Sequence, residues 1–434
     1  MAPFATLFFR FRCTFFPVAL LLTLLVQRGR AQSPMDYSMV PHQTIDPAAP
    51  DGFSLFDSAF YQNQLFLLGE SHGVQQPQRL DLALLKHLNQ RTGLRHYLAE
   101  VDATQAHYLN TYLQTGNEGP LDRVFQFWRG QKAQWGNRDF RQKIQAIRAY
   151  NQTRPRARRI RFVGIDRLQD YPLTAEYLTR LLDHRPLPAA ARPLADTLLQ
   201  QLRTNRPDSL IGTTALAWLR QIETAPRAYS RAFGQSADTL RHLLTNAGYL
   251  KTIPGREGTL FANFSQLLPG LGQEKLYGLW GFFHVLQTKP LTSGKPLACR
   301  IRESDLYLHD RVVSIVFSYL DSYTMLPSSY LPLSMRDGNN PFSPVRQFNN
   351  DGSFLHTEGI ETMRAVTVPH TATLFALDRP GSPARQTPLR ITYGPMMPRS
   401  QQIQFDPARP ITASFQYVWL VRDSPMTQPL PDGH

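Results

Sequence analysis

Four short, largely apolar stretches of the sequence are each followed by ionisable residues, and long helical patterns separate most of them. These stretches are residues 65–68, 95–99, 161–165 and 276–280, and a fifth apolar stretch covers residues 312–317. Strands that alternate with helices favour a mainly parallel sheet, because parallel neighbours need a crossover connection between them. The sequence therefore predicts an α/β fold with a mainly parallel central sheet covered by helices.

The remaining segments predict one α/β hydrolase-like domain over residues 51–434. The chain has 434 residues and 42% hydrophobic residues, which is enough to bury a core. Helical patterns interrupted by prolines predict a helical insertion over about residues 171–270, which we expect to cap the sheet. The segment 323–368 is rich in Pro, Ser, Asn and Gly and predicts a loop excursion. Late strands at 373–377 and 415–421 are expected to add an antiparallel edge within a loop-rich C-terminal part.

The N-terminal segment has the pattern of a secretory signal peptide. Arg10 and Arg12 precede a mostly apolar run over 13–26, and Gly29 and Ala31 stand at the small-residue positions of a cleavage site. We expect residues 1–31 to be a signal peptide, with a retained N-terminal anchor as the alternative, and residues 32–50 to be a flexible lead-in. The protein is then exported, periplasmic or secreted. No other stretch is long and apolar enough to predict a membrane span.

Charge and cysteine content exclude several classes of protein. The formal net charge of +14 falls to +10 when the four arginines of residues 1–31 are removed. The arginines are dense only over 154–161, without interleaved aromatic residues, so we expect a solvated basic surface and no nucleic-acid partner. Only Cys299 remains after residue 31, which excludes an intramolecular disulfide and a cysteine-based zinc site.

The turn Gly69-Glu70-Ser71-His72-Gly73 carries a carboxylate, a hydroxyl and an imidazole directly after the first apolar stretch. Open α/β sheets bind their ligands at the carboxyl ends of the strands. Ionisable residues follow the next three stretches as well, namely Glu100, then Asp166 and Arg167, then His284. If the sheet is parallel, these side chains converge at one edge. We therefore predict a shared active site there.

Three mechanisms compete for these residues. Ser71 fits the Gly-x-Ser-x-Gly pattern of a nucleophile elbow, with His284 as its base, although few residues precede this turn and Glu70 would oppose an oxyanion. In general-base hydrolysis, His72 or His284 takes a proton from water while Glu70 and Glu100 orient the imidazole. Arg167 or Arg256 would then hold a substrate carboxylate or an oxyanion. In metal-assisted hydrolysis, His72, Glu100 and His284 hold a divalent ion.

The order of these motifs resembles the erythromycin-esterase-like family. The likeness spans about residues 60–320 and includes the Gly-Glu-x-His turn, Glu100, Gly164-Ile165-Asp166, Gly281-x-x-His284, and Arg256-Glu257 followed by Asn263. The wider superfamily includes ChaN-like haem-binding lipoproteins and Tiki metalloproteases. The resemblance implies active-site roles for Glu70, His72, Glu100 and His284, with Arg256 and Glu257 supporting. The first motif has two residues between Gly and His, as in the haem-binding and Tiki branches, whereas erythromycin esterases usually have three.

We expect an exported hydrolase that cleaves an ester or related acyl bond of a small molecule by water activation, with no required cofactor. Asp166, Arg167, Arg256 and Glu257 are the expected substrate-binding or supporting residues. The alternatives are a metal-dependent hydrolase or peptidase that uses the same residues, and a non-enzymatic protein that binds haem or another small molecule. Aromatic residues beside His284 suit a haem pocket, but they suit a core strand equally well.

Overall fold

The computed structural model describes residues 34–49 and 52–431. The predicted signal peptide lies outside the described residues. An eight-stranded sheet in the order β1-β10-β12-β6-β2-β5-β3-β4 forms the centre. Its strands are β1 (His42–Ile45), β2 (Leu65–Glu70), β3 (His96–Ala99), β4 (Arg161–Gly164), β5 (Leu276–Gly281), β6 (Val312–Leu320), β10 (Ala372–Ala376) and β12 (Tyr417–Arg422).

The sheet is mainly parallel, which confirms the predicted α/β fold. β2 lies at the centre, between β5 and β6, and is parallel to both. β3 and β4 extend the parallel sheet on one side, and β12 extends it on the other. β10 is antiparallel to both of its neighbours, β12 and β1. Of the two late strands, therefore, one is antiparallel and the other continues the parallel sheet.

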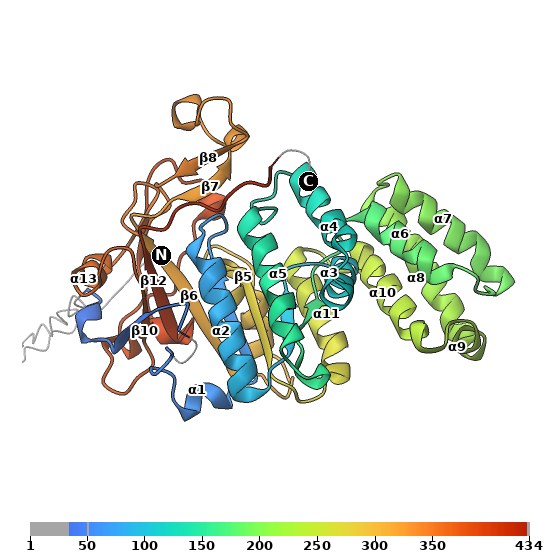
Figure 1. Ribbon diagram of the computed structural model, residues 1–434, viewed down its shortest axis with the longest axis horizontal. Coiled ribbons are helices and arrows are strands. Elements are labelled where there is room, and N and C mark those ends of the chain that lie inside the picture. Colours follow the sequence, from blue (N-terminus) through green and yellow to red (C-terminus); the bar gives the residue numbers. More distant parts are fainter. Residues whose placement is uncertain (1–33, 50–51, 432–434) are drawn as a thin grey trace, which may run out of the picture. The chain divides into compact units, whose positions relative to one another are not determined.

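Helices cover both faces of the sheet. All residues of β2 are buried; Phe66 and Leu68 pack into one apolar cluster, and Leu65 and Leu67 into another. This two-sided burial explains why a central parallel strand reads as a continuous apolar run. Figure 1 shows α2 and α5 lying in front of the strands. The helices that carry the first cluster are α2 (Gln76–Thr92), α3 (Ala103–Thr115), α4 (Glu118–Gly130) and α5 (Arg138–Gln152). The second cluster includes α11 (Arg256–Leu271), α12 (Leu297–Arg302) and α13 (Ile360–Ala365).

The segment between β4 and α11 forms a helical bundle with an apolar core of its own. Leu198, Trp218 and Leu244 are among the buried residues of this third cluster. Figure 1 shows the bundle beside the sheet, and α6 contacts α3 while α10 contacts α11. The predicted insertion is thus a module beside the sheet, and Asn246 of α10 donates to the backbone oxygen of Asp166 at 3.3 Å. Its helices are α6 (Tyr171–Leu182), α7 (Arg192–Arg203), α8 (Asp208–Thr224), α9 (Pro226–Phe233) and α10 (Ala237–Thr252).

Two segments expected to lack regular structure contain strands. The lead-in expected to be flexible contains β1, whose residues pair with β10, and Met35 and Tyr37 near its start are buried. The segment 323–368 contains β7 (Thr324–Pro327) paired with β8 (Phe342–Val345), and β9 (Leu355–Thr357) pairs with β11 (Ile391–Tyr393). A short helix, α1 (Ser58–Gln62), precedes β2. These strands are short and lack the apolar alternation that would predict them.

No helix within residues 34–49 and 52–431 is long and apolar enough to cross a membrane.

Gly278 permits the close approach of β5 to β3, and we predict that Gly278→Ala destabilises the fold. A Cβ atom at this position would lie 2.3 Å from the backbone oxygen of Leu98, so the strands would have to separate. Overpacking of a core costs about 1–3 kcal/mol, and urea unfolding followed by circular dichroism would measure the loss. Gly270→Ala is the control, because Gly270 is helical and exposed, and a Cβ atom added there would meet no neighbouring atom within 4 Å. Equal stability of the two variants would contradict this account.

Candidate active site

The carboxyl ends of four parallel strands bring the predicted residues together. Glu70 is the last residue of β2, and Glu100 directly follows β3. Asp166 follows β4, and His284 lies in the short 3-10 helix Phe282–Val285 after β5. Arg256 contacts Asp166, His284 and Glu100. His72 lies between Glu70 and Glu100 and so connects Glu70 to the others.

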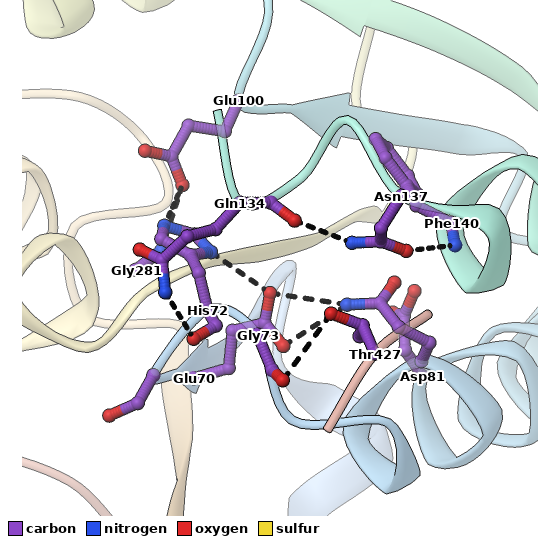
Figure 2. Close-up of polar contacts among 12 residues, drawn as sticks. Glu70, His72, Gly73, Asp81, Glu100, Gln134, Asn137, Phe140, Gly281 and Thr427 are labelled. Atoms are coloured by element: carbon purple, nitrogen blue, oxygen red, sulfur yellow. Dashed lines mark hydrogen bonds and ion pairs between the residues drawn. The ribbon is translucent and has the colours of Figure 1, made fainter. Parts of the chain in front are cut away.

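His72 lies between two carboxylates (Figure 2). Its Nδ1 atom is 3.0 Å from Glu70 Oε1, and its Nε2 atom is 3.8 Å from Glu100 Oε2. Because a carboxylate only accepts hydrogen bonds, the neutral imidazole carries its proton on Nδ1 and its lone pair on Nε2. Gln78 in the first turn of α2 donates from Nε2 to both oxygens of Glu70, at 3.2 and 3.1 Å, and so fixes that carboxylate.

His284 also lies between two carboxylates, on the other side of Glu100, although its Nδ1 atom is close to Glu257 without hydrogen-bond geometry. Its Nδ1 atom lies 2.7 Å from Glu257 Oε1, and its Nε2 atom lies 3.5 Å from Glu100 Oε1. Arg256 Nη1 lies 3.2 Å from the same Nε2 atom. A guanidinium only donates hydrogen bonds, so Nε2 of His284 is the acceptor and its lone pair is occupied. The two histidines therefore differ: only the Nε2 lone pair of His72 has no hydrogen-bond donor among the described residues.

Glu100 is the shared centre of the site. Its Oε1 accepts from Arg256 Nη2 at 2.7 Å, and its Oε2 accepts from the backbone N–H of Gly281 at 2.8 Å. Burial alone would raise the pKa of Glu100, but His284 and Arg256 lower it to about 2. Glu100 therefore stays ionised at neutral pH.

The start of α11 places Arg256 and Glu257 at the site. Glu257 in the first turn suits the positive end of the helix dipole, whereas Arg256 does not and needs anionic partners. Asp166, which is fully buried, accepts from Nε of Arg256 at 2.9 Å and also from Nη2. Asn263, about two turns further along α11, donates to the backbone oxygens of Ile165 and Asp166 and fixes the end of β4. Arg256 is held as a permanent cation that is still 37% exposed.

Gly281 allows the two imidazoles to approach each other. A Cβ atom at this position would lie 3.2 Å from His72 Nε2 and 3.4 Å from His284 Cδ2. The contact with His72 is tighter than side chains normally make, so a larger residue would displace that ring. The second glycine-containing turn thus contributes space as well as a backbone donor.

The electrostatic environment favours the protonated form of His72. Burial lowers the pKa of this imidazole, but the hydrogen bond with Glu70 and the charge of Glu100 outweigh burial. The net direction is upward from the ordinary value of 6.5. A proton taken up by His72 is therefore well stabilised.

Two predicted residues lie away from this arrangement. The guanidinium of Arg167 pairs with Asp208 at the start of α8, and only its backbone N–H contacts Asp166. Arg167 is therefore a link to the helical bundle, not a part of the site centre. Ser71 is exposed, and its backbone N–H donates to Tyr319 Oη at 3.2 Å. Within the described residues no hydrogen bond joins its hydroxyl to either imidazole, so the geometry does not favour an elbow nucleophile.

The donor set does not fit the metal ion of the alternative, metal-dependent mechanism. His72, Glu100 and His284 converge, but a nitrogen of Arg256 already lies within hydrogen-bond distance of both Glu100 and His284. A dication at that point would face a guanidinium cation. In the part of the chain that the structure describes, no group of three or more His, Cys, Asp or Glu side chains is placed to hold a metal.

The structure adds residues that the sequence did not reveal. Gln78 contacts Glu70, and Trp135, in the loop between α4 and α5, packs its ring edge-on to His72 at 5.3 Å between centroids. Behind them, Lys143 donates to Asp81 Oδ2 at 2.6 Å, and both side chains are buried. Gln78 and Asp81 are three residues apart and share one helix face, which in the sequence is only a weak indication that both lie near the site. No pattern marks Trp135 or Lys143.

Comparisons with known proteins agree with this fold. The erythromycin esterase family model matches residues 90–251. A mutant of the erythromycin esterase EreC in its open conformation is 14% identical with a TM-score of 0.58, covering 88% of this chain and 98% of that one. A Bacillus cereus protein is 15% identical with a TM-score of 0.57, covering 90% and 97%. A succinoglycan biosynthesis protein is 16% identical with a TM-score of 0.61, covering 90% and 96%.

No curated protein matches the sequence. The resemblance predicted from the motifs is nevertheless confirmed by the family model and by the shared architecture. This chain is therefore similar to the erythromycin esterase family, in sequence over residues 90–251 and in fold over most of its length.

Proposed function

We propose that this protein hydrolyses an ester bond of a small molecule, with His72 as the general base that activates water. The observation that supports this most is the difference between the two histidines. Arg256 covers Nε2 of His284, whereas Nε2 of His72 has only a carboxylate at 3.8 Å. A general base needs a free lone pair within reach of water, and His72 is 23% exposed on its side chain.

Glu70 prepares His72 for this role. It holds Nδ1–H, so that the imidazole presents Nε2, and it stabilises the imidazolium that forms after proton transfer. Glu100 adds a second negative charge near Nε2. Gln78 in turn holds Glu70 in place. This arrangement corresponds to a carboxylate–histidine pair with its supporting hydrogen bonds.

Arg256 is the proposed electrophilic group. Hydrolysis of an ester passes through a tetrahedral intermediate whose oxygen is negatively charged, and a fixed cation stabilises it. Arg256 is fixed by Asp166 and Glu100 and remains partly exposed. The leaving alcohol oxygen takes up the proton that His72 removed from water, while His284, next to Arg256, would lie beside the same oxyanion.

The guanidinium in the position of a metal ion supports hydrolysis without a metal. We predict that activity on a simple ester is unchanged, within about twofold, after dialysis against a chelator, because Arg256 supplies the positive charge. Ester turnover before and after chelation, with metal content measured on both samples, is the test. Restoration of a lost activity by Zn²⁺ or Mn²⁺ would support the metal-dependent alternative instead.

Export is proposed from residues 1–31 alone. Cell fractionation with N-terminal sequencing of the mature protein would test both the location and the cleavage site. A protein recovered in the cytoplasm with an intact N-terminus would contradict export.

His72→Ala should lower kcat/KM for a nitrophenyl ester by about 10²–10⁴-fold, because it removes the general base. Ser71→Ala is the matched control: it alters the neighbouring hydroxyl and should keep most of the activity. Both variants should keep the melting temperature of the parent protein within a few degrees. If Ser71→Ala were inactive and His72→Ala active, the serine would be the nucleophile and the proposal would be wrong.

A plot of kcat/KM against pH should have an ascending limb whose apparent pKa lies above 6.5. The reason is that His72 must be deprotonated to act as the base, and its pKa is raised in the folded protein. Activity should therefore rise with pH through this limb. Glu70→Gln removes the hydrogen-bonding anion that raises the pKa, so the limb should move to lower pH while the maximal rate falls. Measurement of kcat/KM from about pH 5 to 9 checks both effects. If the apparent pKa of the ascending limb were the same in Glu70→Gln and in the parent protein, a group other than His72 would control it.

A further inference from the structure

The turn that carries His72 is held by three other parts of the chain. It joins the end of β2 to the start of α2, and residues 71–75 form no helix or strand of their own. The backbone oxygens of His72 and Gly73 accept hydrogen bonds from the loop 131–137, from the start of β7 and from the C-terminal segment 424–429. A connecting turn is mobile unless such contacts fix it, so these donors decide where His72 lies.

Gln134, in the loop 131–137, contacts the backbone of His72 directly (Figure 2). Its side-chain amide nitrogen donates to the backbone oxygen of His72 at 3.0 Å and to that of Met325 at 2.6 Å. An amide NH2 group has two protons, so both are used and the turn is tied to the start of β7. The next residue, Trp135, packs against the imidazole of His72 with 5.3 Å between the ring centroids. One loop therefore contacts both the backbone and the side chain of the proposed base.

The C-terminal segment 424–429 holds the next carbonyl group of the turn. The backbone N–H of Thr427 donates to the backbone oxygen of Gly73 at 2.8 Å, and the N–H of Met325 donates to the same oxygen at 2.9 Å. Figure 2 shows Thr427 beside Gly73. Thr427 is fully buried, and a hydrogen bond that is shielded from water is electrostatically stronger than an exposed one.

The same segment is also bound to the part of the chain that carries Gln134. The backbone oxygen of Gln428 accepts from the N–H of Arg138 at 2.8 Å, and the N–H of Gln428 donates to Asp139 Oδ2 at 2.7 Å. Arg138 and Asp139 directly follow the loop 131–137, at the start of α5. The segment therefore joins the His72 turn to the loop beside it, so movement of either one would break hydrogen bonds.

These contacts affect the reaction because Glu70 and His72 are fixed in different ways. Glu70 is the last residue of β2, which lies within the sheet, whereas His72 lies in the turn. The distance of 3.0 Å between Glu70 Oε1 and His72 Nδ1 therefore depends on where the turn is held. Misplacement of a catalytic group by about 1 Å can lower a rate on the order of a hundredfold.

We propose that Gln134 and Thr427 are positioning residues for the general base: they hold the His72 turn where Nδ1–H can donate to Glu70. The inference rests on the proposed function, in which that hydrogen bond makes the imidazole present Nε2 to water. It gives the C-terminal segment 424–429, which no sequence motif marks, a part in the reaction.

Gln134→Ala tests the contact from the loop, and Gln131→Ala is its matched control. Gln131 lies in the same loop, but its side chain is exposed and makes no hydrogen bond within the described residues. Gln134→Ala should lower kcat/KM for a nitrophenyl ester by about tenfold or more, because the backbone of His72 loses its donor. Gln131→Ala should keep the parent activity within about twofold. Equal activity of the two variants would overturn the role of Gln134.

Thr427→Pro and Thr427→Val form a second pair of variants. Proline removes the backbone N–H that donates to Gly73, whereas valine keeps it and removes only the hydroxyl, which lies 3.3 Å from the same oxygen. Thr427→Pro should therefore lose activity as Gln134→Ala does, and Thr427→Val should keep most of it. If Thr427→Pro does not fold, Asp139→Ala replaces it, because this change removes the acceptor of the Gln428 N–H. Parent-like activity of the folded variant would overturn the role of the segment.

The pKa of His72 separates a positioning role from a merely structural one. Burial lowers this pKa and so does the charge of Arg256, but the hydrogen bond with Glu70 and the charge of Glu100 outweigh them. A turn that moves away from Glu70 should therefore bring the pKa of His72 down towards 6.5. The imidazole C–H signal that disappears in His72→Ala identifies this residue in NMR spectra, and its pH titration gives the pKa. Far-UV circular dichroism confirms that each variant is folded.

This titration needs no substrate, so it distinguishes failure of the positioning role from failure of the proposed function. The pKa of His72 should be lower in Gln134→Ala than in the parent protein and unchanged in Gln131→Ala. If this holds but no ester is hydrolysed, the esterase proposal alone fails. If the pKa of His72 is the same in folded Gln134→Ala and in the parent protein, the positioning role is wrong, even if the protein hydrolyses esters.

Discussion

The site depends on one carboxylate that several elements share. Glu100 follows β3, yet it accepts from Arg256 of α11 and from the backbone of Gly281 after β5, and it lies within 4 Å of a nitrogen of each histidine. A buried carboxylate without such partners would be protonated or destabilising, and here its neighbours hold the pKa at about 2. Loss of this one charge would free Arg256 on one side and remove the anion facing both imidazoles.

The helix α11 explains how distant residues meet at this carboxylate. It follows the inserted bundle in sequence but packs with the sheet-face cluster through Leu260 and Phe264. Its first residues are held at the strand ends by Asp166 and Glu100. Asp166 and Glu100 together offset the unfavourable placement of an arginine at a helix start. The resulting ion-pair network joins three strand ends to the start of α11, and Asn246 of the bundle donates to the backbone oxygen of Asp166 within it.

Much of this arrangement follows from strand geometry and was predictable. Parallel strands have their carboxyl ends at one edge, so Glu70, Glu100, Asp166 and His284 were expected to converge. Arg167 lies outside the centre of the site, because its guanidinium pairs with Asp208 while the preceding Asp166 holds Arg256.

Contacts that depend only on tertiary packing could not be predicted from the sequence. Trp135 lies in a loop whose approach to His72 depends on how α4 and α5 pack, and β1 is a short, mostly polar edge strand without an apolar pattern. Periodicity reports which face of an element is buried, but it does not report which loop will cover it.

The strand order has a consequence for how the sheet can be assembled. β12 lies between β6 and β10, so neither β10 nor β1 can join the parallel sheet until residues 417–422 are in place. β1 is among the first described residues and must wait for a partner some 330 positions later, a contact with a high entropic cost of closure. During synthesis, the strands that carry the site can form first, while one edge of β6 stays open until β12 pairs with it.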